Sequence, residues 1–172
     1  MGFVFAAVFL WFARPTVTTL LLSVLLVAPG LWLRGYAAGY VRKNAELTTS
    51  GPYAYTRNPL YLGSMSIAFG FGVAAGSWPL LLLLAVLFAA IYLPTIQAEE
   101  EYLGTHFAGF DTYAARVPRL LPRLTPAQTG GEAGAFSRVL YLHHREYNAL
   151  MGAGAIYLAL ALRLVFKGHL HR

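Results

Sequence analysis

Two polar clusters flank a long apolar stretch of this sequence, and their side chains are of kinds that bind charged groups. Residues 48–63 read TTSGPYAYTRNPLYLG and combine three tyrosines and Arg57 with glycine-proline and asparagine-proline turns. The pair Glu99-Glu100 follows the apolar stretch. Aromatic faces and carboxylates attract cations, whereas a guanidinium suits a carboxylate. A pocket between the two clusters would be lined by tyrosine rings, an arginine and carboxylates.

The stretch between the clusters predicts a helical hairpin. From Asn58 to Ala98 the chain contains no Asp, Glu, Lys or Arg, and Gly76-Ser77-Trp78-Pro79 is a turn signal between two apolar runs. We expect one arm over about Pro59–Ala75, with proline at the helix start, and the other over about Leu80–Gln97. Because the arms are antiparallel, both polar clusters return to the same interface.

The composition predicts a membrane protein. Of 172 residues, 58% are hydrophobic and 12% are charged, whereas about a quarter of an ordinary soluble domain is charged. This composition disfavours a soluble monomer and excludes a disordered chain. The absence of cysteine excludes disulfides, thiolate metal sites and cysteine nucleophiles. The net charge of +6 comes from arginines that flank apolar runs, so we interpret them as membrane flanks and expect no nucleic-acid partner.

Further apolar runs give the expected architecture. Thr16–Leu33 predicts a third crossing and residues 147–166 a C-terminal transmembrane helix. Met1–Phe12 is short and fits either a truncated span or a half-buried helix. We therefore expect an all-α, polytopic integral membrane protein with about five membrane-embedded helices, forming a single domain over residues 1–172 with a motif-bearing core at 35–123.

The basic residues predict the orientation. Nine of the thirteen lie on the side of the hairpin that carries the polar clusters: Arg34, Arg42, Lys43, Arg57, Arg116, Arg119, Arg123, Arg138 and Arg145. The positive-inside rule makes that side cytoplasmic. All seven acidic residues lie on the same side, so we expect a pocket facing the cytoplasm, in the inner membrane of a prokaryote.

Three motifs together resemble the isoprenylcysteine carboxyl methyltransferase and phospholipid methyltransferase superfamily. They are the segment Gly51–Gly63, then Glu99-Glu100-x-x-Leu103-x-x-x-Phe107, and finally Tyr113-x-x-x-Val117-Pro118-Arg119. The similarity covers roughly residues 35–123. It implies S-adenosylmethionine as cofactor, with S-adenosylhomocysteine as product, and a lipophilic acceptor dissolved in the bilayer.

The resemblance also implies roles for particular residues. The implied catalytic residues are Arg57 and Glu100. The implied cofactor-binding residues are Tyr53, Arg57, Asn58, Pro59, Tyr61, Leu62, Gly63, Glu99 and Glu100. Weaker substrate assignments fall on Tyr55, Arg119 and Arg145. No metal ligand is implied.

The physical demands of methyl transfer agree with this interpretation. In-line displacement at a sulfonium needs orientation more than acid–base groups, so few catalytic residues are required. Tyrosine faces and a carboxylate suit the sulfonium and amino groups, and Arg57 suits a carboxylate of the cofactor or of an acidic acceptor. An amine acceptor would need a glutamate to remove its proton, whereas a carboxylate acceptor needs no base.

The sequence leaves two alternatives for the methyl acceptor. Gly51-Pro52-Tyr53 and Val117-Pro118-Arg119 favour O-methylation of a prenylated cysteine, as in the isoprenylcysteine enzymes. Asn58-Pro59 and Ser64 favour phospholipid N-methylation, because Asn58 stands where the isoprenylcysteine enzymes usually have histidine. A non-enzymatic membrane protein on the same scaffold is a further alternative.

Simpler roles compete for several of these residues. Tyr55 could belong to an aromatic belt at the interface, and Glu101 could face water. Gly70-x-Gly72-x-x-x-Gly76 lies in an apolar arm with no preceding strand, so it indicates helix packing rather than nucleotide binding. The run 143–146, HHRE, lacks zinc spacing; we interpret it as a headgroup-facing amphipathic turn, with a role in positioning the acceptor as the alternative.

Overall fold

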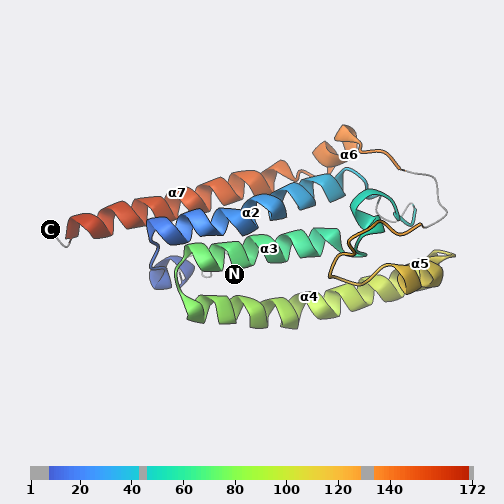
Figure 1. Ribbon diagram of the computed structural model, residues 1–172, viewed down its shortest axis with the longest axis horizontal. Coiled ribbons are helices and arrows are strands. Elements are labelled where there is room, and N and C mark those ends of the chain that lie inside the picture. The colour runs from blue at the N-terminus through green and yellow to red at the C-terminus, as the bar shows by residue number, and fades with distance from the viewer. Residues whose placement is uncertain (1–7, 43–45, 129–133, 171–172) are drawn as a thin grey trace.

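The computed structural model describes residues 8–42, 46–128 and 134–170. In these residues it contains helices and no strand: α2 (Val17–Ala38), the 3-10 helix η1 (Gly51–Ala54), α3 (Pro59–Ala74), α4 (Trp78–His106), α5 (Phe110–Arg116), α6 (Arg138–His143) and α7 (Tyr147–Leu170). The helices α2, α3, α4 and α7 run lengthwise, and η1, α5 and α6 gather at one end (Figure 1). The prediction of an all-α fold is confirmed.

Helix α2 packs along α3, and glycines set how closely the two approach. Thr16 caps α2 by accepting a hydrogen bond from the Thr19 N–H, and Thr19 caps in return. A Cβ on Gly63 would lie 2.8 Å from the carbonyl oxygen of Gly30, and a Cβ on Gly30 would lie 2.8 Å from that of Gly63. Two larger residues at this crossing would force the helices apart.

The hairpin of α3 and α4 is present, with a longer second arm than expected. Gly76 turns the chain with φ +60°, a left-handed conformation that favours glycine. The first arm ends at Ala74, one residue from the predicted end, whereas α4 continues nine residues past Gln97 to His106. The charged residues Glu99, Glu100 and Glu101 therefore lie within a helix and not beyond it.

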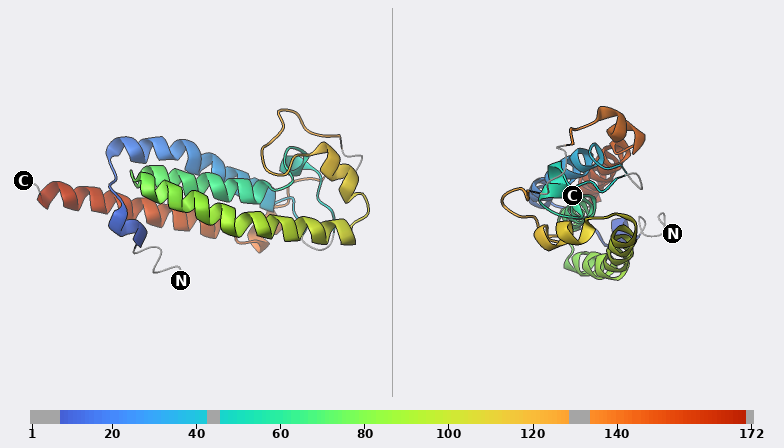
Figure 2. Two further views of the ribbon diagram at one scale, coloured as in Figure 1. Left: turned by 90° about the horizontal axis from the view of Figure 1, so that it is seen from below. Right: turned by 90° about the vertical axis from the view of Figure 1, so that its right-hand side faces the viewer.

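The loop after α5 holds residues 51–63, which we call the motif segment, in place. Backbone N–H groups of Arg57, Arg123 and Ala127 donate to the carbonyls of Pro118 (3.0 Å), Tyr55 (2.9 Å) and Ala54 (2.9 Å) respectively. Beneath this contact, Phe110, Tyr113, Val117 and Ala127 form a small buried core. Residues around 55 and 120 thus form one unit at the polar end of the bundle, which Figure 2 shows from two further directions.

Three of the described helices are long and apolar enough to cross a membrane: α2, α4 and the Tyr147–Phe166 part of α7. Helix α3 is apolar but has 16 residues, about 24 Å at 1.5 Å per residue, which is shorter than a bilayer core of about 30 Å. Of the expected Met1–Phe12 helix, residues 1–7 lie outside the described part, and residues 8–12 are helical.

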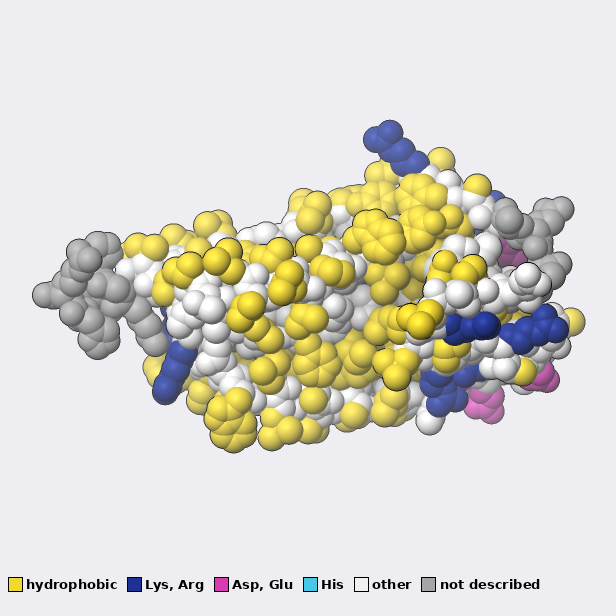
Figure 3. All heavy atoms as spheres, in the orientation of Figure 1, with side chains coloured by type: hydrophobic (Ala, Val, Ile, Leu, Met, Phe, Trp, Pro, Cys, Tyr) yellow, Lys and Arg dark blue, Asp and Glu magenta, His cyan; other side chains and the backbone are white. Residues whose placement is uncertain are grey.

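The surface matches a membrane protein. Hydrophobic side chains cover the long sides of the bundle, and most of the charged side chains visible in Figure 3 lie at the end that carries α5. At the other end, Arg163 of α7 donates to the carbonyls of Ala13 and Trp11, both at 2.9 Å. This arginine caps the short N-terminal helix, a use of its charge that hydropathy alone did not predict.

Candidate active site

A cavity of about 320 Å³ lies where the motif segment, the start of α3 and the last turns of α4 meet. Its lining combines apolar, aromatic and charged groups: Arg34, Val41, Glu46, Leu47, Thr48, Tyr53, Arg57, Asn58, Pro59, Leu60, Tyr61, Ser64, Tyr92, Glu99, Glu100, Leu103, Phe110, Tyr113 and Glu146. The volume is within the usual range for small-molecule sites, about 300–1,000 Å³. The two polar clusters do return to one place.

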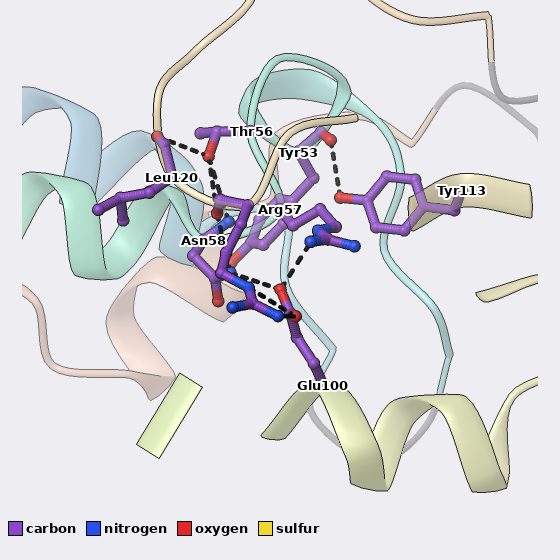
Figure 4. A network of polar contacts seen from close by, with 8 residues as sticks. Tyr53, Thr56, Arg57, Asn58, Glu100, Tyr113 and Leu120 are labelled. Atoms are coloured by element: carbon purple, nitrogen blue, oxygen red, sulfur yellow. Dashed lines mark hydrogen bonds and ion pairs between the residues drawn. The ribbon is translucent and has the colours of Figure 1, made fainter. Parts of the chain in front are cut away.

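Glu100 is the centre of the polar network (Figure 4). Its side chain is 10% exposed, and it points from α4 toward the motif segment. Asn58 donates to Oε1 from Nδ2 at 3.2 Å, and Arg119 donates to Oε2 from Nε at 2.9 Å. The Arg57 Nε lies 3.2 Å from Oε1. One carboxylate thus faces two guanidinium groups and an amide, which offsets the cost of burying its charge.

Asn58 occupies the N-cap position of α3, but its side chain contacts Glu100 instead of capping the helix. Asparagine at a helix N-cap normally accepts a hydrogen bond from the first turn, but Asn58 makes no side-chain cap to α3. Its amide instead donates to Glu100 and, at 2.9 Å, to the carbonyl of Arg119. Pro59 follows at the first helical position, where its missing N–H leaves nothing unsatisfied. The side chain at the N-cap position therefore contributes to the polar network of the cavity and not to the end of the helix.

Arg57 retains unused donors. Its side chain is 13% exposed and makes one ion pair among the described residues, with Glu100. The Nε group is buried and forms no hydrogen bond, because its N–H is not aimed at an acceptor. A guanidinium has five N–H donors. Arg57 can therefore bind an additional anionic group at the cavity wall.

The two glutamates of the pair have different surroundings. Successive helical residues are about 100° apart, so Glu100 faces inward while Glu99 lies on the exposed side. Tyr61 on α3 donates to Glu99 Oε2 at 2.9 Å, and its ring meets Tyr92 edge-on with centroids 5.5 Å apart. This wall offers a carboxylate and two aromatic rings, the combination that attracts a cation.

Tyr53 and Tyr113 close the cavity on the side of η1 and α5. The Tyr113 hydroxyl donates to the carbonyl oxygen of Tyr53 at 2.8 Å. Burial raises the pKa of both phenols; Glu99 adds to the rise at Tyr53, and the Arg57 guanidinium opposes it at Tyr113. Both phenols therefore stay neutral at physiological pH and act as hydrogen-bonding and packing groups.

The predicted site residues divide into three groups. Lining the cavity are Tyr53, Arg57, Asn58, Pro59, Tyr61, Glu99 and Glu100. Outside the lining are Leu62 and Gly63, the latter packed against Arg34 and Gly30 of α2. Of the weaker substrate candidates, Arg119 reaches the network through Glu100, Tyr55 pairs through its backbone with Arg123, and Arg145 is exposed in the turn before α7 with φ +53°.

Sequence reasoning missed Arg34, Glu146 and Tyr92 as lining residues. We expected Arg34 to flank a helix that ends at Leu33, but α2 continues to Ala38. A charged residue within a long apolar helix requires a partner, and this could have indicated a site. Its partner, Glu146, lies in the run 143–146 that we interpret from the sequence as a headgroup-facing turn. In the described residues no three His, Asp or Glu gather as a metal site would require.

The chain belongs to the phospholipid methyltransferase family. The sequence profile of that family matches residues 17–109, more than half of the chain, which span α2, the motif segment, α3 and α4. Distant similarity to an isoprenylcysteine methyltransferase supports the wider superfamily. No solved structure matches the chain.

Three curated relatives show how the chain is similar to named proteins. It is 37% identical over 67% of its length to the nickel-cobalt-cadmium resistance protein NccN of Alcaligenes xylosoxydans xylosoxydans and to the cobalt-zinc-cadmium resistance protein CzcN of Cupriavidus metallidurans. It covers 54% and 53% of those proteins, so it spans about half their length. It is 32% identical over 46% of its length to the protein-S-isoprenylcysteine O-methyltransferase of Schizosaccharomyces pombe, of which it covers 34%.

Proposed function

We propose that this protein is an S-adenosylmethionine-dependent methyltransferase that modifies a lipophilic acceptor at the polar end of its helical bundle. The observation that carries the proposal is the meeting of Arg57, Asn58 and Glu100 at one cavity, although Asn58 and Glu100 are 42 positions apart. Family membership supports the reaction class. The long apolar helices support an acceptor that reaches the site from the membrane.

The chemistry of the lining fits the cofactor. Glu99 with the rings of Tyr61 and Tyr92 suits the positively charged sulfonium and amino groups, and the free donors of Arg57 suit the carboxylate. When bound, S-adenosylmethionine supplies an electrophilic methyl group. The residues of this chain orient both reactants and exclude water, which is the main contribution an enzyme makes to such a displacement.

The hydrogen bonds and ion pairs that Glu100 already makes favour a carboxylate acceptor over an amine. An ammonium acceptor must lose a proton before it attacks a methyl group, so a free base is needed. Both oxygens of Glu100 already face cationic or amide donors, and Glu99 accepts from Tyr61. The other two carboxylates of the lining, Glu46 and Glu146, form ion pairs with arginines. A carboxylate acceptor needs no base. We therefore favour carboxyl O-methylation, of the kind that the isoprenylcysteine methyltransferase name describes, over the N-methylation that the family's phospholipid name describes.

We also propose that the polar end faces the cytoplasm of a prokaryotic cell, with the helices in its inner membrane. The gathering of charge at that end supports this orientation through the positive-inside rule. Beyond the three membrane-length helices, α3 and the segment before α2 would be embedded, giving about five membrane-embedded helices. A water-soluble cofactor would then enter from the cytoplasm.

The test is calorimetric binding of S-adenosylhomocysteine to the detergent-purified protein. We expect binding in the parent and at least a tenfold loss in Arg57→Ala and Glu100→Ala. Glu101→Ala is the matched control, because Glu101 is the adjacent exposed carboxylate on α4 and does not line the cavity. It should bind like the parent.

The reaction is then assigned by incubating the protein with S-adenosylmethionine that carries a radiolabelled methyl group. A prenylated cysteine is the acceptor in one assay and phosphatidylethanolamine in the other, and the labelled product is identified in each. Base-labile label in the first supports O-methylation, and stable label in the second supports the N-methylation alternative. If the folded, monodisperse parent does not bind S-adenosylhomocysteine, the proposed methyltransferase activity is refuted. A non-enzymatic role would then remain, which the resistance-protein names of two relatives would allow.

A further inference from the structure

Residues 116–124, which we call the arginine–leucine loop, hold three arginines and no acidic residue. The middle arginine, Arg119, is committed to the cavity, because it pairs with Glu100. The outer two, Arg116 and Arg123, form no ion pair among the described residues. The function proposed above uses neither of them. Their positive charge is therefore available for a partner outside the bundle.

Main-chain carbonyl groups hold the two outer arginines in the same part of the molecule. Nη1 of Arg123 donates to the carbonyl oxygen of Arg116 at 2.7 Å, and Nη1 of Arg116 donates to the carbonyl oxygen of Gln128 at 2.9 Å. A guanidinium has five N–H donors, so most donors of each arginine are left unused by the described residues. Guanidinium groups bind phosphates through paired, charge-assisted hydrogen bonds. Two of them in one loop favour a phosphate-bearing ligand.

Two leucines of the same loop are exposed although the backbone around them is fixed. The N–H of Arg123 donates to the carbonyl oxygen of Tyr55 at 2.9 Å, and the carbonyl oxygen of Leu120 accepts from a hydroxyl of the motif segment at 2.9 Å. With the backbone held at these two points, Leu121 and Leu124 are 75% and 100% exposed. An apolar phase that covers such side chains stabilises them. The loop therefore presents apolar and cationic groups together.

The loop lies at the level where the apolar helices meet the polar end. Its hydrogen bonds to the motif segment place it beside the start of α3 at Pro59. Figure 2 shows the chain that follows α5, drawn in gold, standing out to the side of the bundle. The headgroup layer extends about 5–7 Å beyond the hydrocarbon on each side of a bilayer. A segment that projects sideways at this level lies over the headgroups of the surrounding lipids.

We propose that the arginine–leucine loop is a contact site for acidic phospholipids. Leu121 and Leu124 enter the boundary between headgroups and acyl chains, and Arg116 and Arg123 bind the lipid phosphates. Charge complementarity selects acidic lipids, because basic side chains at a membrane surface attract them. The same loop supplies Arg119 to the polar network of the cavity, so the lipid contact holds a segment that the site uses. The contact depends on the membrane location of the helices and not on the methyltransferase reaction.

The first test measures whether the loop touches lipid, with a fluorophore on a single cysteine in mixed vesicles of phosphatidylcholine and phosphatidylglycerol. Leu124→Cys carries it in the loop, and the full exposure of Leu124 means that no packing contact is lost. Thr112→Cys is the matched control, because Thr112 is exposed on α5 at the outer end of the bundle. A lipid spin-labelled high in its acyl chain should quench position 124 and not position 112. Quenching of both positions by a neutral aqueous quencher alone would overturn the proposal.

The second test identifies the headgroup by attaching the same spin label to phosphatidylglycerol or to phosphatidylcholine. The acidic lipid should quench position 124 more strongly, and Arg116→Gln should lower this preference about fivefold, the effect of one arginine at a charged surface. Arg116→Lys keeps the charge and should restore most of the preference, which a misfolded loop would not. Arg138→Gln is the matched control, because Arg138 is an exposed arginine on α6. Equal quenching by the two lipids, or an equal loss in Arg138→Gln, would overturn the site.

Discussion

Arg119 meets a single oxygen of Glu100 with two of its nitrogens, at 2.9 Å from Nε and 2.8 Å from Nη2, and leaves the other oxygen to Asn58 and Arg57. Arg119 comes from the loop after α5, Asn58 and Arg57 from the motif segment, and Glu100 from α4. One carboxylate thus joins three separate parts of the chain at the cavity.

Removing Glu100 should lower the stability of the protein more than removing its partner Arg119. Glu100→Ala leaves the guanidinium of Arg57, which is 13% exposed, buried without its partner, and should lower the free energy of unfolding by about 3 kcal/mol. Arg119→Ala should lower it by only about 1 kcal/mol, because Arg119 is 46% exposed and Glu100 keeps Arg57 and Asn58. Thermal unfolding in detergent checks the order, and equal losses would contradict it.

The glycine of the motif should be required for packing. A Cβ on Gly63 would lie 2.8 Å from the Gly30 carbonyl oxygen, which is backbone and cannot move aside. Gly63→Ala should therefore destabilise the protein by about 1–3 kcal/mol. Gly154→Ala is the control, since nothing lies within 4 Å of its Cβ position, and it should be neutral or slightly stabilising. Similar melting temperatures for the two variants would count against the close α2–α3 crossing.

Removing the Tyr113 hydroxyl should weaken the cavity wall in a pH-dependent way. Tyr113→Phe leaves the Tyr53 carbonyl without its 2.8 Å donor, at a cost of about 1–3 kcal/mol. Burial raises the pKa of Tyr113 above the value of about 10 that an unfolded tyrosine has. Its contribution is thus complete below pH 10 and is lost as the pH rises toward the folded pKa.

The measurement is unfolding of parent and variant between about pH 8 and 11. The stability gap between them should stay constant up to about pH 10 and then narrow. The raised pKa of Tyr53 leaves some alkaline destabilisation in both proteins. A gap that widens above pH 10 would show that the sign assigned to Tyr113 is wrong.

The orientation can be measured with single cysteines, because the chain has none of its own. Thr125→Cys places a thiol on the exposed loop at the polar end, and Ser77→Cys places one at the hairpin turn at the opposite end. A membrane-impermeant maleimide should label position 77 in intact spheroplasts and position 125 only in inverted vesicles. The reverse pattern would place the cavity outside the cytoplasm.

Hydropathy and motif spacing predicted the hairpin and seven of the nineteen residues that line the cavity. In lipid a backbone satisfies its hydrogen bonds within helices or closed barrels, and the continuous charge-free run from Asn58 to Ala98 with its Gly-Ser-Trp-Pro turn favours two helices. Antiparallel arms then bring Arg57 and Glu100 together whatever else packs around them. Those two residues and Tyr61 were predicted for the same cavity, and the structure brings all three to it.

The sequence by itself determined the apolar helices and which ends carry the charge, because hydropathy acts within one segment. Only the tertiary structure decided which faces of those helices meet. It turned Gly63 toward α2 and Tyr61 toward Glu99, and it kept Arg34 within α2 by placing Glu146 beside it. Such choices depend on contacts between residues 33 to 112 positions apart in the chain, and no local pattern of residues records those contacts.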